Sequence, residues 1–255
     1  MIFAATGAIG GAVARRFARE GARVFASGRD LAALERLAGE IRAQGGQVEV
    51  AQVDATSEEQ IESHLAAVVR SARGIDVVLN AIGIRVGEGA YGTPCVGLRH
   101  DDFMLPIARH LGSQFLTSRA AARHMAEARR GTVLTLSASI GKEARPFMAG
   151  VSAACAGIEA MTRVLASELA PHVRVLCLRP GAILETRTIR ETMAANARTA
   201  GIPLETFAGA IREASLMRRT PTLDEVAGVA ALLASDRASC MTGQVINASC
   251  GLVLH

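Results

Sequence analysis

Aromatic side chains are scarce in this 255-residue sequence, which has no tryptophan, a single tyrosine (Tyr91) and 3% aromatic residues overall. Proteins that bind nucleic acids commonly stack bases on aromatic rings beside a basic stripe. The formal net charge is +4, but the basic residues, all arginine except Lys142, are spread among 24 acidic residues. The composition therefore argues against a nucleic-acid partner.

Cysteine motifs and membrane-spanning runs are also lacking. The five cysteines are odd in number and show no CxxC spacing, which indicates reduced, mostly buried thiols in a cytoplasmic protein and no metal site. No window reaches the roughly 18 apolar residues of a transmembrane helix, so no membrane association is expected. The apolar N-terminal stretch lacks the basic residues that open a signal peptide. Because the sequence starts almost inside its first strand, we expect a few upstream residues to be missing from it.

Nothing divides the chain into parts: there is no linker rich in proline, glycine or serine, no charge block and no internal repeat. Half of the residues are hydrophobic, which suits one compact domain, 1–255, with a large core.

Short apolar strands alternate with amphipathic helices along the whole sequence. This alternation predicts an α/β fold with a parallel sheet, because strand-helix-strand units place their strands side by side in the same direction. We expect a single-domain Rossmann fold, a doubly wound sheet of about seven strands with helices on both faces. The expected strands lie at 2–3, 23–27, 47–53, 75–79, 132–136, 173–178 and 244–248, and the expected helices begin at Gly11, Asp30, Ser57, Asp101, Val151 and Thr222.

The first sixteen residues carry the clearest functional pattern. Ile2 and Phe3 indicate the end of a buried strand, 5–10 a tight turn of small residues, and Gly11 onward a helix. Such a turn directs backbone N–H groups and the positive end of a helix dipole toward an anion, which is how a dinucleotide pyrophosphate is held. A small-residue turn alone is a weak signal, and a purely structural turn is an equal alternative.

Further segments make the chain resemble the short-chain dehydrogenase/reductase family over nearly its full length. The resemblance rests on Asp54 after the third strand, on an Asn-Ala-Ile-Gly turn at 80–83, and on Arg-Pro-Gly at 179–181. It also rests on 222–227 and 241–247, which are similar to the family's C-terminal signature. The resemblance implies a nicotinamide cofactor bound by Ala4, Thr6, Gly7, Ala8, Ile9, Gly10, Ser27, Gly28, Arg29, Asp54, Ala55, Asn80, Ala81, Ile82, Pro180, Gly181 and Ile183.

Two features of this predicted cofactor site stand out: its phosphate turn departs from the family's pattern, and the residue after the second strand bears on the choice between NADP(H) and NAD(H). The three glycines of the family's phosphate turn fall on Ala4, Ala8 and Gly10, and a methyl group at Ala8 crowds the pyrophosphate contact, which Gly7 offsets by relaxing the turn. After the second strand the chain offers no acid but Arg29, whose guanidinium suits a 2′-phosphate. NADP(H) is therefore favoured over NAD(H), with a solvated Arg29 as the alternative.

The family's proton-transfer residues are all replaced. The resemblance places the Tyr-x-x-x-Lys pair on Val151 and Cys155, the serine on Ala138 and the asparagine on His110. Val151 cannot exchange a proton, and Cys155 is more simply a buried hydrophobic residue than a nucleophile.

Several residues are candidate substitutes for this lost set. His110 occupies the relay position and titrates near neutral pH, although a structural histidine is the simpler interpretation. Ser137 and Ser139 are candidates for orienting a substrate oxygen, but strand alternation puts both on the face opposite Ala138. Tyr91 and Lys142 lie in separate loops, and we do not expect either one at the site.

The segment 185–217 is helical and rich in methionine, as a lid over a substrate pocket would be. Its residues Met193, Leu204, Phe207, Ile211 and Met217 favour an apolar substrate, although plain packing explains them as well. By resemblance, the helices from Asp101 and Val151 form a homodimer or homotetramer interface through small residues, namely Ala120, Ala121, Ala153 and Ala160.

Three functions follow from these patterns. The first is an NADP(H)-dependent oxidoreductase of non-standard mechanism that acts on a carbonyl, alcohol or activated alkene. The second is a nucleotide-binding regulatory or scaffold protein without turnover, and the third is a lyase or isomerase that uses His110. The fold alone cannot choose among them.

Overall fold

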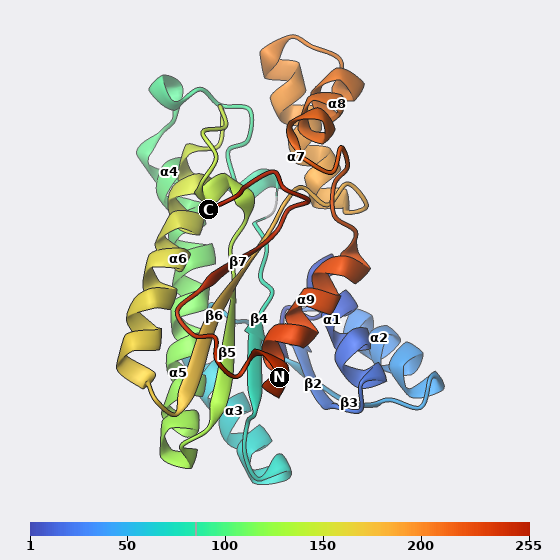
Figure 1. Ribbon diagram of the computed structural model, residues 1–255, viewed down its shortest axis with the longest axis vertical. Coiled ribbons are helices and arrows are strands. Elements are labelled where there is room, and N and C mark those ends of the chain that lie inside the picture. The colour runs from blue at the N-terminus through green and yellow to red at the C-terminus, as the bar shows by residue number, and fades with distance from the viewer. Residues whose placement is uncertain (85) are drawn as a thin grey trace.

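Seven parallel strands form one sheet in the order β3-β2-β1-β4-β5-β6-β7 (Figure 1). The computed structural model describes residues 1–84 and 86–255. The strand order reverses between β1 and β4, and such a switch point opens a crevice at the carboxyl edge of a parallel sheet. The predicted doubly wound Rossmann fold is confirmed. The strands are β1 (Ile2–Phe3), β2 (Arg23–Gly28), β3 (Gln47–Gln52), β4 (Val77–Asn80), β5 (Gly131–Leu136), β6 (Val173–Pro180) and β7 (Val245–Ala248).

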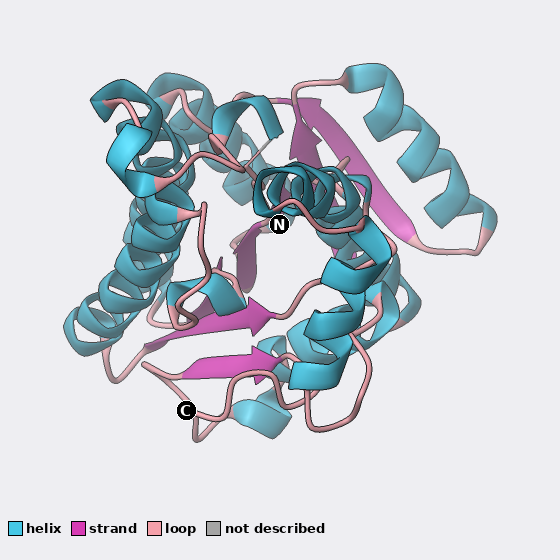
Figure 2. Cartoon of the chain, turned by 90° about the horizontal axis from the view of Figure 1, so that it is seen from above, coloured by secondary structure: helices cyan, strands magenta, loops and turns pink. Residues whose placement is uncertain are grey.

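Helices cover both faces of this sheet, as the view from above shows (Figure 2). One apolar cluster joins the sheet to α1, α2 and α9, and a second joins its other face to α3, α5 and α6. The helices are α1 (Ala8–Arg19), α2 (Leu31–Ala43), α3 (Glu58–Ala72), α4 (His100–Pro106), α5 (Gly112–Ala128), α6 (Ala149–Leu169), α7 (Arg187–Ala200), α8 (Leu204–Ala214) and α9 (Leu223–Ala234).

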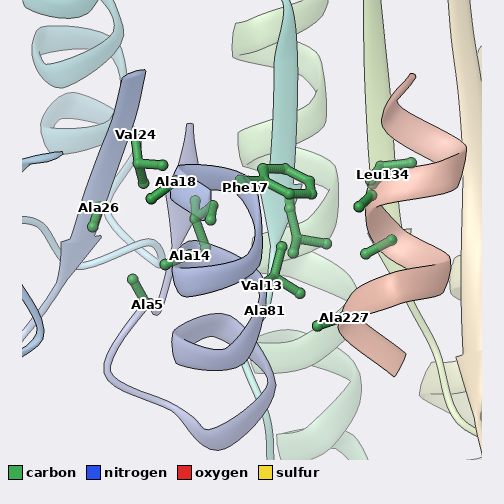
Figure 3. Close-up of a cluster of buried hydrophobic side chains, with 14 of the residues drawn as sticks. Ala5, Val13, Ala14, Phe17, Ala18, Val24, Ala26, Ala81, Leu134 and Ala227 are labelled. Atoms are coloured by element: carbon green, nitrogen blue, oxygen red, sulfur yellow. The ribbon is translucent and has the colours of Figure 1, made fainter. Parts of the chain in front are cut away.

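Helix α1 lies at the centre of the first cluster (Figure 3). Its apolar face, with Val13 and Phe17, packs against β2 and against Ala227 of α9. Val13 is fully buried and Phe17 is 8% exposed. Burying such side chains stabilises the fold by about 1.5–3 kcal/mol each, which anchors the turn that precedes α1.

The expected helix starts at Asp30, Ser57 and Thr222 are confirmed, because each of these side chains caps its helix. The Asp30 carboxylate accepts a hydrogen bond from the Ala33 N–H at 2.9 Å. Thr222 and Glu225 form a reciprocal capping box at the start of α9. Such caps satisfy backbone donors that have no partner within the helix.

Two helix predictions are corrected. Helix α1 begins at Ala8 rather than Gly11, with Gly7 as its N-cap, so the preceding turn is shorter than expected. The expected helix over 101–128 is continuous, but it is not α-helical throughout: α4 ends at Pro106, a π-helical turn spans Ile107–Leu111, and α5 follows directly. Proline lacks the N–H that continues an α-helical ladder, and π turns of this kind often mark functional sites.

Burial of the cysteines differs from the prediction. All five are free, but only Cys155 and Cys177 are buried, while Cys95 and Cys240 are exposed and Cys250 is intermediate. The number and spacing of the cysteines do not tell whether each one lies in a loop or in the core.

Helix α6 bears on the expectation drawn from apolar runs. Within 1–84 and 86–255 it is the one helix whose length, 21 residues, and mean hydropathy, 1.2, would suit a membrane span. It instead packs against β6 and α4 and contributes Ile158 and Ala166 to the interior. It is a core helix of the domain.

Candidate functional site

A cavity of about 510 Å³ runs along the carboxyl edge of the sheet. Its walls come from the turns that follow β1, β2, β3, β4, β5 and β6, from the start of α6, and from the lid helices α7 and α8. All of the predicted cofactor residues line it except Gly10, Ser27 and Asn80. The sheet therefore brings together, in one place, segments that are far apart in the sequence.

The turn after β1 is tight and is held by its own backbone. Ala4 adopts a left-handed conformation with φ 56°, and its carbonyl accepts a hydrogen bond from the Gly7 N–H at 3.0 Å. A Cβ atom at Gly10 would lie 2.6 Å from the Ala4 carbonyl oxygen, closer than real contacts allow. Gly10 thus lies behind the cavity wall and permits the close approach of helix and turn.

The start of α1 is available to an anion. The helix has no acidic residue in its first turn, and no side chain caps its backbone N–H groups. Thr6, Gly7 and Ala8 are exposed along the cavity. Because unpaired N–H groups and the helix dipole attract negative charge, this end suits a pyrophosphate.

The ends of β2 and β3 place a basic and an acidic side chain on the same wall. Arg29 is exposed there, next to buried Gly28. Burial raises the pKa of Asp54, but hydrogen bonds from Thr56 and the charge of Arg29 outweigh it, and the net shift is downward. Asp54 is therefore an ionised acceptor. Ser27 lies elsewhere: its hydroxyl faces the Ile2 carbonyl at 3.4 Å, inside the sheet.

The turns after β4 and β6 are fixed by hydrogen bonds. Buried Asn80 accepts from the Ile82 N–H at 2.8 Å and donates to the Thr117 hydroxyl at 2.9 Å, so it shapes the turn from behind while Ala81 and Ile82 line the cavity. Gly181 donates its N–H to the Ala248 carbonyl at 3.0 Å.

At the far end of the cavity lies an apolar corner, which we call the catalytic corner because the sequence resemblance predicts the proton-transfer positions there. Val151 and Cys155 of α6 are 4% and 1% exposed. Burial raises the pKa of Cys155 to about 12, so it stays a neutral thiol. The catalytic corner consists of Ile84, Tyr91, Ala138, Ile140, Met148, Val151 and Cys155.

His110 reaches this cavity from the π-helical turn and is 5% exposed. Burial lowers its pKa to about 4, which a hydrogen bond with the Ile82 backbone only partly offsets. Its Nδ1 atom is buried without a hydrogen-bond partner. A neutral imidazole is a poor proton donor near pH 7, so this environment favours a hydrogen-bond acceptor rather than the acid expected from the sequence.

Ser137 and Ser139 line the cavity together with Ala138, so the alternation expected from a continuous strand is wrong. The strand ends at Leu136, and Ser139 opens a 3₁₀ turn that changes the direction of the chain. The Ser137 hydroxyl donates to Glu159 at 3.0 Å.

Glu159 forms a buried ion pair beside the catalytic corner. Its two oxygens accept from Arg179 Nε at 2.7 Å and Nη2 at 2.5 Å, and both side chains are at most 7% exposed. Arg179 also donates to Asn247 at 3.0 Å. The pair links α6, β6 and β7, and it holds Ser137 by its hydroxyl.

Tyr91 contradicts the expectation that it lies away from the site. It lines the cavity and packs in the catalytic corner, whereas Lys142 is exposed and not in the cavity wall. Burial raises the pKa of Tyr91 well above its ordinary value, with nearby Cys155 acting in the same direction and Thr192 opposing it. A loop position gives no periodic signal, which is why the sequence did not place this residue.

The lid is formed by α7 and α8, which project from one end of the domain in orange (Figure 1). Met193, Phe207 and Ile211 line the cavity, but Leu204 and Met217 are 43% and 57% exposed and do not. The sequence missed two polar members of this wall: Thr192 and Asn196 are buried, one helical turn apart, and Asn196 Oδ1 has no hydrogen-bond partner, while Thr192 lies against Tyr91.

Comparison with known proteins agrees with this architecture. The family model described as "Enoyl-(Acyl carrier protein) reductase" matches residues 4–253. A 3-oxoacyl-[acyl-carrier-protein] reductase of Thermotoga maritima is 30% identical, with coverage of 100% of this chain and 97% of the relative. An uncharacterized oxidoreductase of Methylorubrum extorquens is also 30% identical, over 99% of this chain and 96% of its own. The chain belongs to the short-chain dehydrogenase/reductase family.

Solved structures of this family superpose closely. NAD⁺-bound xylitol dehydrogenase has a TM-score of 0.92 at 27% identity, covering 98% of this chain and 96% of its own. Actinorhodin polyketide ketoreductase with NADPH has a TM-score of 0.89 at 26% identity, covering 98% and 95%. The chain is thus an oxidoreductase of the short-chain dehydrogenase/reductase family, whose structural neighbours bind nicotinamide cofactors of either kind.

Proposed function

We propose that this protein binds NADP(H) and transfers hydride to or from a carbonyl, an alcohol or an activated alkene, without the family's usual proton-transfer set. The observation that carries the proposal is the continuous wall of the cavity. It runs from the free N-terminus of α1, past Arg29 and Asp54, to the Pro180–Gly181 turn beside the catalytic corner.

The residues of this wall fit a nicotinamide dinucleotide. The left-handed Ala4 and the close approach at Gly10 form a turn that presents backbone N–H groups to a diphosphate. Ionised Asp54 is an acceptor for a base or ribose group, and the turn at 180–183 supplies an apolar surface. The bound cofactor supplies the hydride; the chain binds, orients and excludes water.

The preference for NADP(H) rests on Arg29. Asp30, the nearest acid, also lines the cavity, but its Oδ1 accepts the Ala33 N–H that caps α2. Arg29 lies exposed on the cavity wall beside Gly28, and guanidinium groups bind phosphate through two donors at once. The exposed position of Arg29 on the cavity wall supports binding of the 2′-phosphate that distinguishes NADP(H) from NAD(H).

One observation favours a second candidate, a nucleotide-binding protein without turnover. The catalytic corner is packed with apolar side chains where the family has ionisable ones, and its thiol stays protonated. Lyase or isomerase chemistry through His110 is less favoured, because a neutral imidazole with a pKa of about 4 is both a weak acid source and a weak base.

The test has two steps. Titration with NADPH, followed by cofactor fluorescence, is expected to show saturable binding. A panel of ketones, β-keto esters and enones is then screened for loss of NADPH absorbance. Binding with turnover supports the proposal, binding without turnover across the panel favours the second candidate, and no binding contradicts both.

We also propose a cytoplasmic location, where NADPH is supplied, and assembly into a dimer or tetramer. Ala120 and Ala121 cannot form the interface, because they are 1% and 0% exposed inside the chain's own core. On the same two helices Phe115, 42% exposed, and Val164, 56% exposed, are the apolar candidates. Size-exclusion chromatography with light scattering tests the assembly.

A further inference from the structure

We propose that Tyr91 is the proton donor of this site, delivered to the substrate oxygen from the loop after β4 rather than from α6. The inference rests on the proposed function, because it needs a substrate that receives hydride in the same cavity. It replaces His110 as the candidate for this role. The carbonyl oxygen of the substrate is the group that Tyr91 would bind.

The position of the Tyr91 ring is the first support. It lines the cavity and packs in the same cluster as Ala138, Val151 and Cys155, which are the positions of the replaced residues. The loop after β4 therefore places a phenol in the catalytic corner. The ring also packs closely against the backbone of Gly89, because a Cβ atom at that position would lie 2.3 Å from the ring.

The loop that carries Tyr91 is tied to the lid. The Thr199 hydroxyl of α7 donates to the Gly92 carbonyl at 2.7 Å. Gly92 has φ 83°, and a Cβ atom there would lie 2.9 Å from the same hydroxyl oxygen, so both the conformation and the close approach require glycine. Tyr91 therefore sits between two constrained glycines, and its position is specified by the fold.

The lid supplies an independent sign that a polar group binds here. Asn196 is 1% exposed, lines the cavity and has Oδ1 without a hydrogen-bond partner. Thr192, one turn earlier on the same face, lies next to Tyr91. Because an unsatisfied buried polar atom costs about 1–3 kcal/mol, such atoms indicate a ligand with hydrogen-bonding groups at this end.

The chemistry balances with a neutral phenol. As the carbonyl carbon receives hydride from the reduced nicotinamide, the C=O π electrons move to oxygen, and that oxygen takes the Tyr91 proton. The resulting phenolate regains a proton from water. Burial keeps the phenol protonated near neutral pH, which is the state that reduction requires. In the opposite direction the phenolate must form first, so alcohol oxidation is expected to rise steeply with pH.

The substrate class follows from the two ends of this cavity. The reacting oxygen lies among Tyr91, Thr192 and Asn196, and the rest of the molecule contacts Met193, Phe207 and Ile211. We therefore expect a carbonyl compound with an apolar body, polar at its reacting end.

A spectroscopic test needs no turnover. With no tryptophan and one tyrosine in the chain, the near-ultraviolet phenolate band and the intrinsic fluorescence report Tyr91 alone. We expect the phenolate band to appear well above the pH of an exposed tyrosine, and the fluorescence to change when cyclohexanone or ethyl acetoacetate is added to the NADPH complex. An ordinary titration, or no response to either ketone, would overturn the proposal.

Activity gives the second arm. Tyr91→Phe keeps the ring and is expected to lower kcat at least 100-fold, since general acid catalysis contributes about 10²–10⁴-fold, with NADPH affinity unchanged. Lys142→Ala, at an exposed position outside the cavity, is the control and should be neutral. Full turnover by Tyr91→Phe contradicts the proposal. If the wild-type protein does not bind NADPH, the proposed function is contradicted instead. The phenolate titration then still shows whether Tyr91 is buried.

Discussion

The nucleotide end of the cavity and its catalytic corner depart from the family's residue pattern in different ways. At the nucleotide end, where the resemblance predicts glycines, Ala4 adopts a left-handed conformation and the N-terminus of α1 has no side-chain cap. At the catalytic corner, where the resemblance predicts the proton-transfer set, Ala138 and Val151 carry no ionisable group and Cys155 stays a neutral thiol.

The difference shows what each function requires. Binding of a diphosphate uses backbone N–H groups and a dipole, so a methyl group in place of hydrogen is tolerated where the backbone keeps its path. Proton transfer uses one side-chain atom of a suitable pKa, so its loss has no backbone remedy. Our proposal therefore takes the donor from another element, since the fold places Tyr91 in the wall of the same cavity.

The largest expected effect concerns the ion pair beside the catalytic corner. Glu159→Gln leaves the Arg179 charge buried without its partner and should lower the free energy of unfolding by about 3–5 kcal/mol. The double variant Glu159→Leu with Arg179→Met removes both charges and should recover most of this loss. Urea unfolding measures both. A single variant within about 1 kcal/mol of wild type would show that the pair does not hold this end together.

The second prediction uses pH to probe the corner. Unfolded His110 takes a proton below about pH 6.5, but the folded pKa is about 4, so the unfolded state binds more protons between these values. Stability should therefore fall as the pH drops from 6.5 to 4, by about 3 kcal/mol from this residue. His110→Asn should reduce the dependence in thermal unfolding and leave the part that comes from His64, whose pKa burial also lowers to about 4, whereas His100→Asn, at an exposed site, should not change it. Equal pH profiles for wild type and His110→Asn would contradict the burial of His110.

The third prediction tests the nucleotide end. Gly10→Ala places a methyl group 2.6 Å from the Ala4 carbonyl oxygen and should destabilise the fold by about 1–3 kcal/mol and weaken NADPH binding. Gly39→Ala in α2 meets no atom within 4 Å and should be neutral or slightly stabilising. Calorimetric titration and thermal unfolding separate the two effects. Wild-type binding by Gly10→Ala would show that the turn tolerates a displaced helix.

The smallest effect sharpens cofactor choice. Arg29→Asp should weaken NADPH by about 10–100-fold, because a charge-assisted hydrogen bond contributes about 1.5–3 kcal/mol, and should leave NADH nearly unchanged. Arg36→Asp on the exposed side of α2 is the control of equal charge change. Equal losses for both cofactors would mean that Arg29 does not contact the 2′-phosphate.

Much of this architecture was predictable from sequence because periodicity and caps are local signals. The strands, the capped helices at Asp30 and Thr222, and the doubly wound sheet followed from these patterns. The π-helical turn after Pro106 was missed because the apolar pattern continues across it.

The catalytic corner was predictable only as a set of losses. Val151 and Cys155 were aligned from neighbouring residues in one helix, but Tyr91, Thr192 and Asn196 reach the cavity from a loop and a lid that have no fixed spacing to the sheet. The neutral state of His110 depends on burial by several elements, which no single segment encodes.

Calorimetric titration of the wild-type protein with NADPH, and with NADH for comparison, tests the central claim most directly. A retained nucleotide end predicts saturable binding of both cofactors, with NADPH tighter. If neither cofactor gives a saturable heat of binding, the cavity at the carboxyl edge is not a nucleotide site, and the account is contradicted.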